Sequence, residues 1–208
     1  MSIKIKNNNY GGFTLVELTV TLSIALLLMS IVLFDYRNFN DNLALSSAGQ
    51  EIAISIRQAQ TYGIDVREVS AGGGVFSAAY GVYFDKNLSP SDYYVFADKN
   101  GNKLYDPGVG NCGSATTECI EKVTLRNGVT VSSICNVQAS VTTCPPNVST
   151  VSMHVTFLRP NPDAVIYFAN SSGTVTFSNQ LTGKVRLISR AGKTLDITVE
   201  NTGQILAQ

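Results

Sequence analysis

The sequence predicts an α+β protein, with a long N-terminal α-helix packed on an antiparallel β-sheet domain. Three observations indicate this fold class. An apolar run occupies residues 13–34, and apolar residues then recur at spacings of three and four up to about residue 62. From residue 65 onward, short stretches of alternating apolar and polar residues are separated by turn residues. The first half of the helix is expected to cross a membrane, and the second half to be amphipathic.

The membrane segment is predicted from its length and its flanking charges. The run from Phe13 to Phe34 is apolar except for a few hydroxyls and one carboxylate, Glu17. At about 1.5 Å per residue it forms a helix of roughly 33 Å, close to the thickness of a bilayer's hydrocarbon core. Lys4 and Lys6 precede the run, and positive charges favour the cytoplasmic side. We therefore expect a single-pass protein whose chain beyond Phe34 is exported.

The residues before the apolar run differ from those of an ordinary secretory signal, in which small residues follow the apolar core. Here the small residues, Gly11 and Gly12, come first. The segment closely resembles the type IV prepilin signature, with matches at Gly12, Phe13, Thr14, Leu15 and Glu17, and with Val16 at the free position.

The resemblance implies that residues 1–12 are a leader peptide, that a prepilin peptidase cuts between Gly12 and Phe13, and that the new amine of Phe13 is methylated. It also implies other pilin or pseudopilin subunits and an inner-membrane assembly platform as partners. In such proteins the carboxylate at Glu17 pairs with the amino terminus of a neighbouring subunit. A carboxylate in the bilayer costs about 2.5–3.5 kcal/mol, and an α-amine with a pKa near ~7.7–8.0 can neutralise it.

The second half of the helix is expected over residues 35–63. Its predicted apolar stripe consists of Tyr36, Phe39, Leu43, Leu45, Ala48, Ile52, Ile56 and Ala59. Gly63 is expected close to the C-cap. The exported β-rich domain is expected over residues 64–208.

Ten strands are expected in that domain, at residues 80–84, 93–97, 123–125, 129–134, 151–158, 165–168, 174–177, 184–188, 195–199 and 204–206. Asn127 and Gly128 predict a two-residue hairpin. Alternation places His154 opposite Met153 and Val155, which predicts a surface histidine. With one histidine, no paired acids in a recognisable context and no Gly-x-Ser-x-Gly, the sequence offers no catalytic constellation, and we expect no enzyme.

The cysteines Cys112, Cys119, Cys135 and Cys144 all lie in the exported part, where disulfides form. Four cysteines allow three pairings. We favour Cys112 with Cys119 and Cys135 with Cys144, because each pair closes a short loop rich in turn residues. A zinc site is the alternative, and the absence of a CxxC pair and of a nearby histidine disfavours it.

The segment from Asp98 to Asp106 is a candidate calcium loop. Its expected ligands are Asp98, Asn100, Asn102, the carbonyl of Leu104, and Asp106, at positions 1, 3, 5, 7 and 9. Position 6 is Lys103 instead of glycine, and position 12 is Val109 instead of glutamate. The alternative is a polar turn whose Asp and Asn side chains cap their own backbone. No other cofactor is indicated.

Within the pilin and pseudopilin superfamily, the chain is most like a minor pseudopilin of the GspH/FimT type, through residues 56–63 and 189–203. This resemblance implies a subunit of a type IV pilus or a type II secretion pseudopilus. It would wait in the bacterial inner membrane and enter a filament through its N-terminal helix. A major pilin is the second option. The alternative class is a single-pass, membrane-anchored β-rich binding module that forms no filament and has a calcium-stabilised domain. Zero net charge disfavours nucleic-acid binding.

Overall fold

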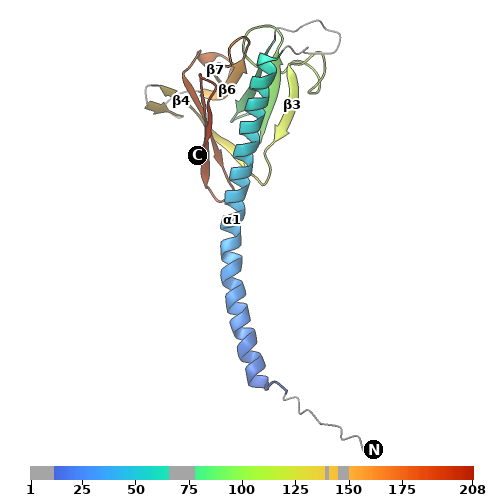
Figure 1. The fold of residues 1–208 in the computed structure, drawn as a ribbon, viewed down its shortest axis with the longest axis vertical. Coiled ribbons are helices and arrows are strands. Elements are labelled where there is room, and N and C mark those ends of the chain that lie inside the picture. Colours follow the sequence, from blue (N-terminus) through green and yellow to red (C-terminus); the bar gives the residue numbers. More distant parts are fainter. Residues whose placement is uncertain (1–11, 66–77, 139–140, 145–149) are drawn as a thin grey trace, which may run out of the picture. The chain divides into compact units, whose positions relative to one another are not determined.

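The computed structural model of the chain describes residues 12–65, 78–138, 141–144 and 150–208. Its contacts divide the protein into two compact units, residues 1–40 and 41–208. The helix α1 (Leu15–Ile64) contributes to both units (Figure 1). The described strands are β1 (Ala79–Asp85), β2 (Asp92–Asp98), β3 (Cys119–Thr124), β4 (Thr130–Gln138), β5 (Val141–Thr143), β6 (Thr150–Phe157), β7 (Ala164–Asn170), β8 (Val175–Phe177), β9 (Thr182–Ile188), β10 (Thr194–Glu200) and β11 (Ile205–Ala207).

In the first unit, α1 is apolar and exposed. Residues Leu15–Leu33 have a mean hydropathy of 2.3, and none of them is buried, so this stretch is long and apolar enough to cross a membrane. The hydroxyls within the stretch donate to backbone carbonyls three or four residues earlier; they belong to Thr19, Thr21, Ser23 and Ser30. Because each of these hydroxyls has its partner inside the helix, they are compatible with a lipid environment.

The second unit contains two antiparallel sheets. One has the strand order β3-β2-β1-β6-β7-β8, and the other has the order β11-β10-β9-β4-β5. The inward side chains of both sheets and of α1 form one apolar core, which includes the fully buried Ile52, Phe84, Met153, Phe168 and Leu187. The expected α+β class and its antiparallel sheets are therefore observed.

Residues 41–64 of α1 contact both sheets. Ser55 Oγ and Tyr93 Oη of β2 lie 2.9 Å apart, and Gly49 packs against Leu195 of β10. The buried stripe contains Ala44, Leu45, Ala48, Ile52, Ile56 and Ala59. The predicted stripe was wrong at its start, because Phe39 and Leu43 are 59% and 51% exposed. At about 100° per residue, Phe39 and Leu43 lie on the side of α1 opposite Ile52, so they face away from the sheets.

Gly63 is needed for packing, one residue before the end of α1. A Cβ atom at this position would come within 2.9 Å of the Cβ and backbone carbon of Phe157 in β6. The same contact brings the Gly63 carbonyl to the backbone N–H of Arg159, at 3.0 Å. The last turn of the helix is therefore fixed directly to the backbone at the end of β6.

The Asn127–Gly128 pair forms the expected turn but not the expected hairpin. Both residues have positive φ, at 57° and 73°, and the Val129 N–H donates to the Arg126 carbonyl. These are the features of a type I′ turn. The flanking strands β3 and β4 do not pair, because each joins a different sheet. The turn therefore carries the chain from one sheet to the other.

Candidate functional site

The helix α1 begins with an N-cap at Thr14. Its Oγ1 accepts a hydrogen bond from the backbone N–H of Glu17 at 3.2 Å, and its carbonyl accepts one from the N–H of Leu18. Thr14 and Glu17 therefore occupy the N-cap and N3 positions of a Thr-x-x-Glu capping box. A carboxylate in the first turn also interacts favourably with the helix dipole. Thr14 thus starts the helix, and the Thr-x-x-Glu spacing in the sequence is the signal for this N-cap that our sequence reasoning missed.

The peptide bond between Gly12 and Phe13 lies outside the helix. Gly12 is exposed, with no neighbouring atom within 4 Å of a Cβ built on it, and Phe13 is 78% exposed. The peptide bond is therefore accessible and non-helical, as cleavage by a peptidase requires. Lys4, Lys6 and Gly11 lie outside the described residues.

The candidate calcium loop is a set of nested Asx turns. Asp98 accepts hydrogen bonds from the backbone N–H groups of Gly101, Asn102 and Lys103. The Asn100 and Asn102 side-chain amides both donate to Asp106 Oδ2, at 2.7 and 2.8 Å. These contacts match the polar-turn alternative. Among the described residues, no group of three or more His, Cys, Asp and Glu side chains is placed to hold a metal ion.

Two further observations bear on this loop. Lys103, at the position that calcium loops give to glycine, has a φ of 64°, so the backbone adopts the left-handed conformation that glycine favours there. Glu118, which is 5% exposed, accepts hydrogen bonds from the N–H groups of Lys99 and Asp106, both at 2.9 Å. Burial raises the pKa of Glu118, and those two N–H groups oppose the rise. Sequence reasoning missed Glu118 because it lies 12 residues after Asp106, inside the segment that the Cys112–Cys119 disulfide closes.

His154 is buried, so its assignment to the surface was wrong. It is 5% exposed, and its Nδ1 accepts a hydrogen bond from the Tyr105 backbone N–H at 2.9 Å. The Tyr83 ring lies 4.7 Å from the imidazole, centroid to centroid. Alternation correctly put His154 on the outer side of β6, but the loop between β2 and β3 covers that side. Burial lowers the pKa of His154 to about 4, and an accepting Nδ1 places the proton of the neutral ring on Nε2.

Tyrosine side chains and the 105–119 loop line an open pocket of about 760 Å³. Tyr94 and Tyr105 stack with centroids 5.3 Å apart, and Lys122 Nζ lies 5.9 Å from the Tyr94 ring centre. Burial raises the pKa of Tyr105 to about 12, so its phenol is neutral. The pocket lining thus combines tyrosine rings with the Lys122 ammonium group and the carboxylates of Asp85 and Glu121.

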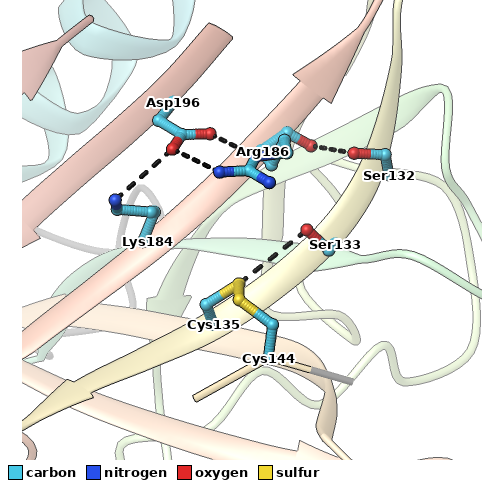
Figure 2. Close-up of polar contacts among 7 residues, drawn as sticks. All are labelled: Ser132, Ser133, Cys135, Cys144, Lys184, Arg186 and Asp196. Carbon is cyan, nitrogen blue, oxygen red and sulfur yellow. Dashed lines mark hydrogen bonds and ion pairs between the residues drawn. A yellow bond between two sulfur atoms is a disulfide. The ribbon is translucent and has the colours of Figure 1, made fainter. Parts of the chain in front are cut away.

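The disulfides join Cys112 to Cys119 and Cys135 to Cys144, the pairs that loop composition favours. The Cα atoms are 4.6 and 4.4 Å apart, as disulfides require. The first closes the loop that precedes β3, and the second ties β4 to the residue after β5 (Figure 2).

The outer face of the second sheet carries an ion-pair cluster (Figure 2). Arg186 binds both oxygens of Asp196, at 2.7 and 2.8 Å, and Lys184 Nζ lies 3.3 Å from Asp196 Oδ2. Hydrogen bonding from Arg186 lowers the pKa of Asp196, and Asp196 raises the pKa of Arg186. The cluster connects β9 to β10 and offers no spare catalytic group.

Comparison with known proteins gives one finding, which concerns the N-terminal segment. A family model described as the prokaryotic N-terminal methylation motif matches residues 7–33. No curated protein and no solved structure matches the chain. The motif, followed by an apolar helix that suits a membrane and by an α+β unit, supports a membrane-anchored type IV pilin-like protein. Such a motif is typical of structural, pilin-type proteins that are substrates of prepilin peptidase, and it does not indicate an enzyme family.

Proposed function

We propose that this protein is a structural subunit, a minor pilin or pseudopilin, of a type IV pilus or a type II secretion pseudopilus in the bacterial inner membrane. The observation that carries the proposal is the methylation motif over residues 7–33, which ends at the last residue of the apolar span. Prepilin peptidase removes residues 1–12 and methylates Phe13. The helix then enters a filament with related subunits on the inner-membrane platform. The likeness of residues 56–63 and 189–203 to the GspH/FimT type favours a minor subunit over a major pilin.

The proposed role of Glu17 is to pair with the amine of Phe13 in a neighbouring subunit. Phe13 and Glu17 are both exposed on the described chain, so a neighbour can reach them. In lipid each charge is costly alone, whereas the pair is neutral and fixes the axial position of one subunit against the next.

A substitution at Glu17 tests this role. Glu17→Val should leave membrane insertion intact and abolish co-assembly with the other subunits. Glu17→Gln is the matched control, because it keeps a hydrogen-bonding side chain at N3 of the capping box and removes only the charge. Both variants should fail to co-purify with sheared filaments. Normal incorporation of Glu17→Gln would contradict the charge-pairing role.

The competing function is a membrane-anchored binding module that forms no filament. The 760 Å³ open pocket beside Tyr94, Tyr105 and Lys122 is the observation that favours it. Under that function residues 1–12 stay on the protein and Phe13 has no free amine.

We also propose that the 98–106 loop binds calcium through Asp98, Asn100, Asn102, the Leu104 carbonyl and Asp106. The positive φ of Lys103, at the position where calcium loops have glycine, supports this assignment. Carboxylate, amide and carbonyl oxygens are the ligands that Ca²⁺ prefers. The cation would stabilise the loop and leave assembly through α1 unchanged.

A further inference from the structure

The strand β3 is the longest edge strand that the structure describes in the second unit. The six-stranded sheet ends in β3 and β8, and the five-stranded sheet ends in β11 and β5 (Figure 1). β5, β8 and β11 have three residues each, whereas β3 has six. Natural proteins often protect a sheet edge from other chains by keeping its strand very short. Of these four strands, β3 is therefore the one best able to accept another strand.

The register of β3 with β2 shows which main-chain groups of β3 point outward. The Leu125 N–H donates to the Ser91 carbonyl at 2.8 Å, so these two residues form a hydrogen-bonded pair. In an antiparallel ladder such pairs alternate with non-bonded pairs, which places Lys122 and Thr124 in non-bonded pairs with β2. The N–H and C=O groups of Lys122 and Thr124 therefore point away from β2. They have no hydrogen-bond partner within the described part of the chain.

The beginning of β3 is covered, whereas its second half is open. The Gly113 N–H donates to the Cys119 carbonyl at 2.7 Å, so the loop before β3 lies along the start of the strand. Further along, Glu121, Lys122 and Thr124 are exposed. We call residues 121–124 the free edge of β3.

A pocket lies on each face of the free edge. On the outer face, the open pocket of about 760 Å³ is lined by β3, Tyr94 and Tyr105. On the inner face, which α1 covers, a second pocket of about 590 Å³ is lined by residues 121–127 and by Glu51 of α1. Glu121 lines both pockets. Because successive side chains of a strand point to opposite faces of its sheet, a strand added here would direct them alternately into the outer and the inner pocket.

The lining of the outer pocket suits an apolar or aromatic side chain. The rings of Tyr94 and Tyr105 stack there, with centroids 5.3 Å apart. Leu88 lines the same pocket and is 83% exposed, so its side chain can be covered by a ligand. Apolar and aromatic linings with a few polar groups are typical of binding pockets, and aromatic side chains are enriched at protein interfaces.

The charged groups of the two pockets do not select one sign of ligand charge. Asp85 is buried and accepts hydrogen bonds from a tyrosine hydroxyl and two backbone N–H groups. Lys122 is paired with Asp92 at 2.9 Å. The remaining charged side chains are Glu51, Glu121 and Arg126 in the lining and Arg190 on the adjacent turn, two of each sign. Recognition at this edge therefore depends on main-chain pairing and on the apolar pocket.

We propose that the free edge of β3 binds an extended peptide segment of a partner protein as an additional strand, with an apolar or aromatic side chain of the peptide in the outer pocket. Main-chain hydrogen bonds to Lys122 and Thr124 provide affinity, and the pocket selects the side chain. The outward N–H and C=O groups alternate as those of a second strand do, so they fit a peptide. The site lies within the second unit and uses neither Phe13 nor Glu17. It therefore goes beyond the proposed filament role, and its failure would leave that role unaffected.

The test begins with a phage-displayed library of random peptides of about seven residues, selected on the full chain in detergent micelles. We expect the enriched peptides to carry an apolar or aromatic residue and to lack proline at the positions that pair with β3. One enriched peptide is then synthesised with a single N-methyl group at each backbone position in turn. Methylation at every second residue should weaken binding about tenfold, and methylation at the residues between should change it by less than about twofold, because only alternate N–H groups bond β3.

Two pairs of variants locate the site on the protein. Thr124→Pro removes an outward N–H, as an edge position permits, whereas Thr124→Val keeps it. Both variants lose the hydrogen bond from the Thr124 hydroxyl to Asp92, so they differ mainly in the N–H. Thr124→Pro should weaken peptide binding about tenfold more than Thr124→Val. Leu88→Ser should also weaken it about tenfold, whereas Leu181→Ser, at a side chain that is 58% exposed and lines neither pocket, should not.

Thermal melting verifies that each variant is folded. Equal binding by folded Thr124→Pro and Thr124→Val would overturn the proposal, as would a library that yields no enriched peptide. If Thr124→Pro does not fold, the N-methylated peptides decide, and equal effects at all their positions would overturn the proposal. A dimer of the full chain that blocks peptide binding and is lost in Thr124→Pro would overturn it in favour of a second copy of the chain.

Discussion

Protonation of His154 should destabilise the second unit at mildly acidic pH. The folded protein holds the imidazole neutral, with a pKa of about 4 against 6.5 for an ordinary histidine. The contribution of the neutral imidazole to the free energy of unfolding is therefore fully present above about pH 6.5, and it is lost as the pH falls toward 4. At ~1.4 kcal/mol per pH unit, this interval corresponds to about 3 kcal/mol. The structural reason is that a proton on Nδ1 removes the acceptor for the Tyr105 N–H and places a charge in a buried site.

The assay is urea unfolding of the detergent-solubilised chain at a series of pH values between about 4 and 7, followed by circular dichroism. Carboxylates such as Asp196 and Glu118 also titrate, so the comparison is with His154→Asn, whose side-chain oxygen can accept the same N–H. The wild-type free energy of unfolding should fall by about 3 kcal/mol more than that of the variant over this range. Parallel pH profiles for the two proteins would refute the assignment of a buried neutral histidine.

Two further predictions concern the helix end and the calcium loop. Gly63→Ala should lower the free energy of unfolding by about 1–3 kcal/mol despite the better helix propensity of alanine, because the new Cβ meets the backbone of Phe157. Gly49→Ala is the control. Its Cβ meets only the flexible end of the Leu195 side chain, so the thermal midpoint should fall by less than in Gly63→Ala. Titration with Ca²⁺ to millimolar concentrations should raise the melting temperature of the wild type saturably and leave that of Asp98→Asn unchanged. An unchanged wild-type midpoint and unchanged Tyr105 fluorescence would leave the loop as a polar turn.

Local sequence patterns predicted the helix and most strands because these elements follow one periodicity at a time. The expected strand at residues 151–158 is β6, and that at 184–188 is the end of β9. β5 was missed, since Val141–Thr143 is too short to show alternation. The Asn127–Gly128 signal correctly gave the turn type, but a turn does not encode which sheets its strands join.

The errors at the candidate sites have a common cause, which is that covering segments come from distant parts of the chain. His154 faces away from the apolar side of β6, as alternation requires, yet Tyr105, 49 residues earlier, closes over it. Glu118 contacts the 98–106 loop from within the segment that the Cys112–Cys119 disulfide closes, 12 residues after Asp106. Phe39 and Leu43 have a different cause: they recur at helical spacings, but at about 100° per residue they lie opposite Ile52, on the side of α1 that the sheets do not cover.

The identity of the mature N-terminus tests the central claim most directly. The protein is isolated from the membrane of its own host, or of a host that carries a prepilin peptidase, and the N-terminal residue and mass are determined. The pilin-like account predicts a chain that starts at N-methylated Phe13. A membrane-inserted chain that still begins at Met1 or Ser2 would contradict it, since the amine needed to neutralise Glu17 would be absent.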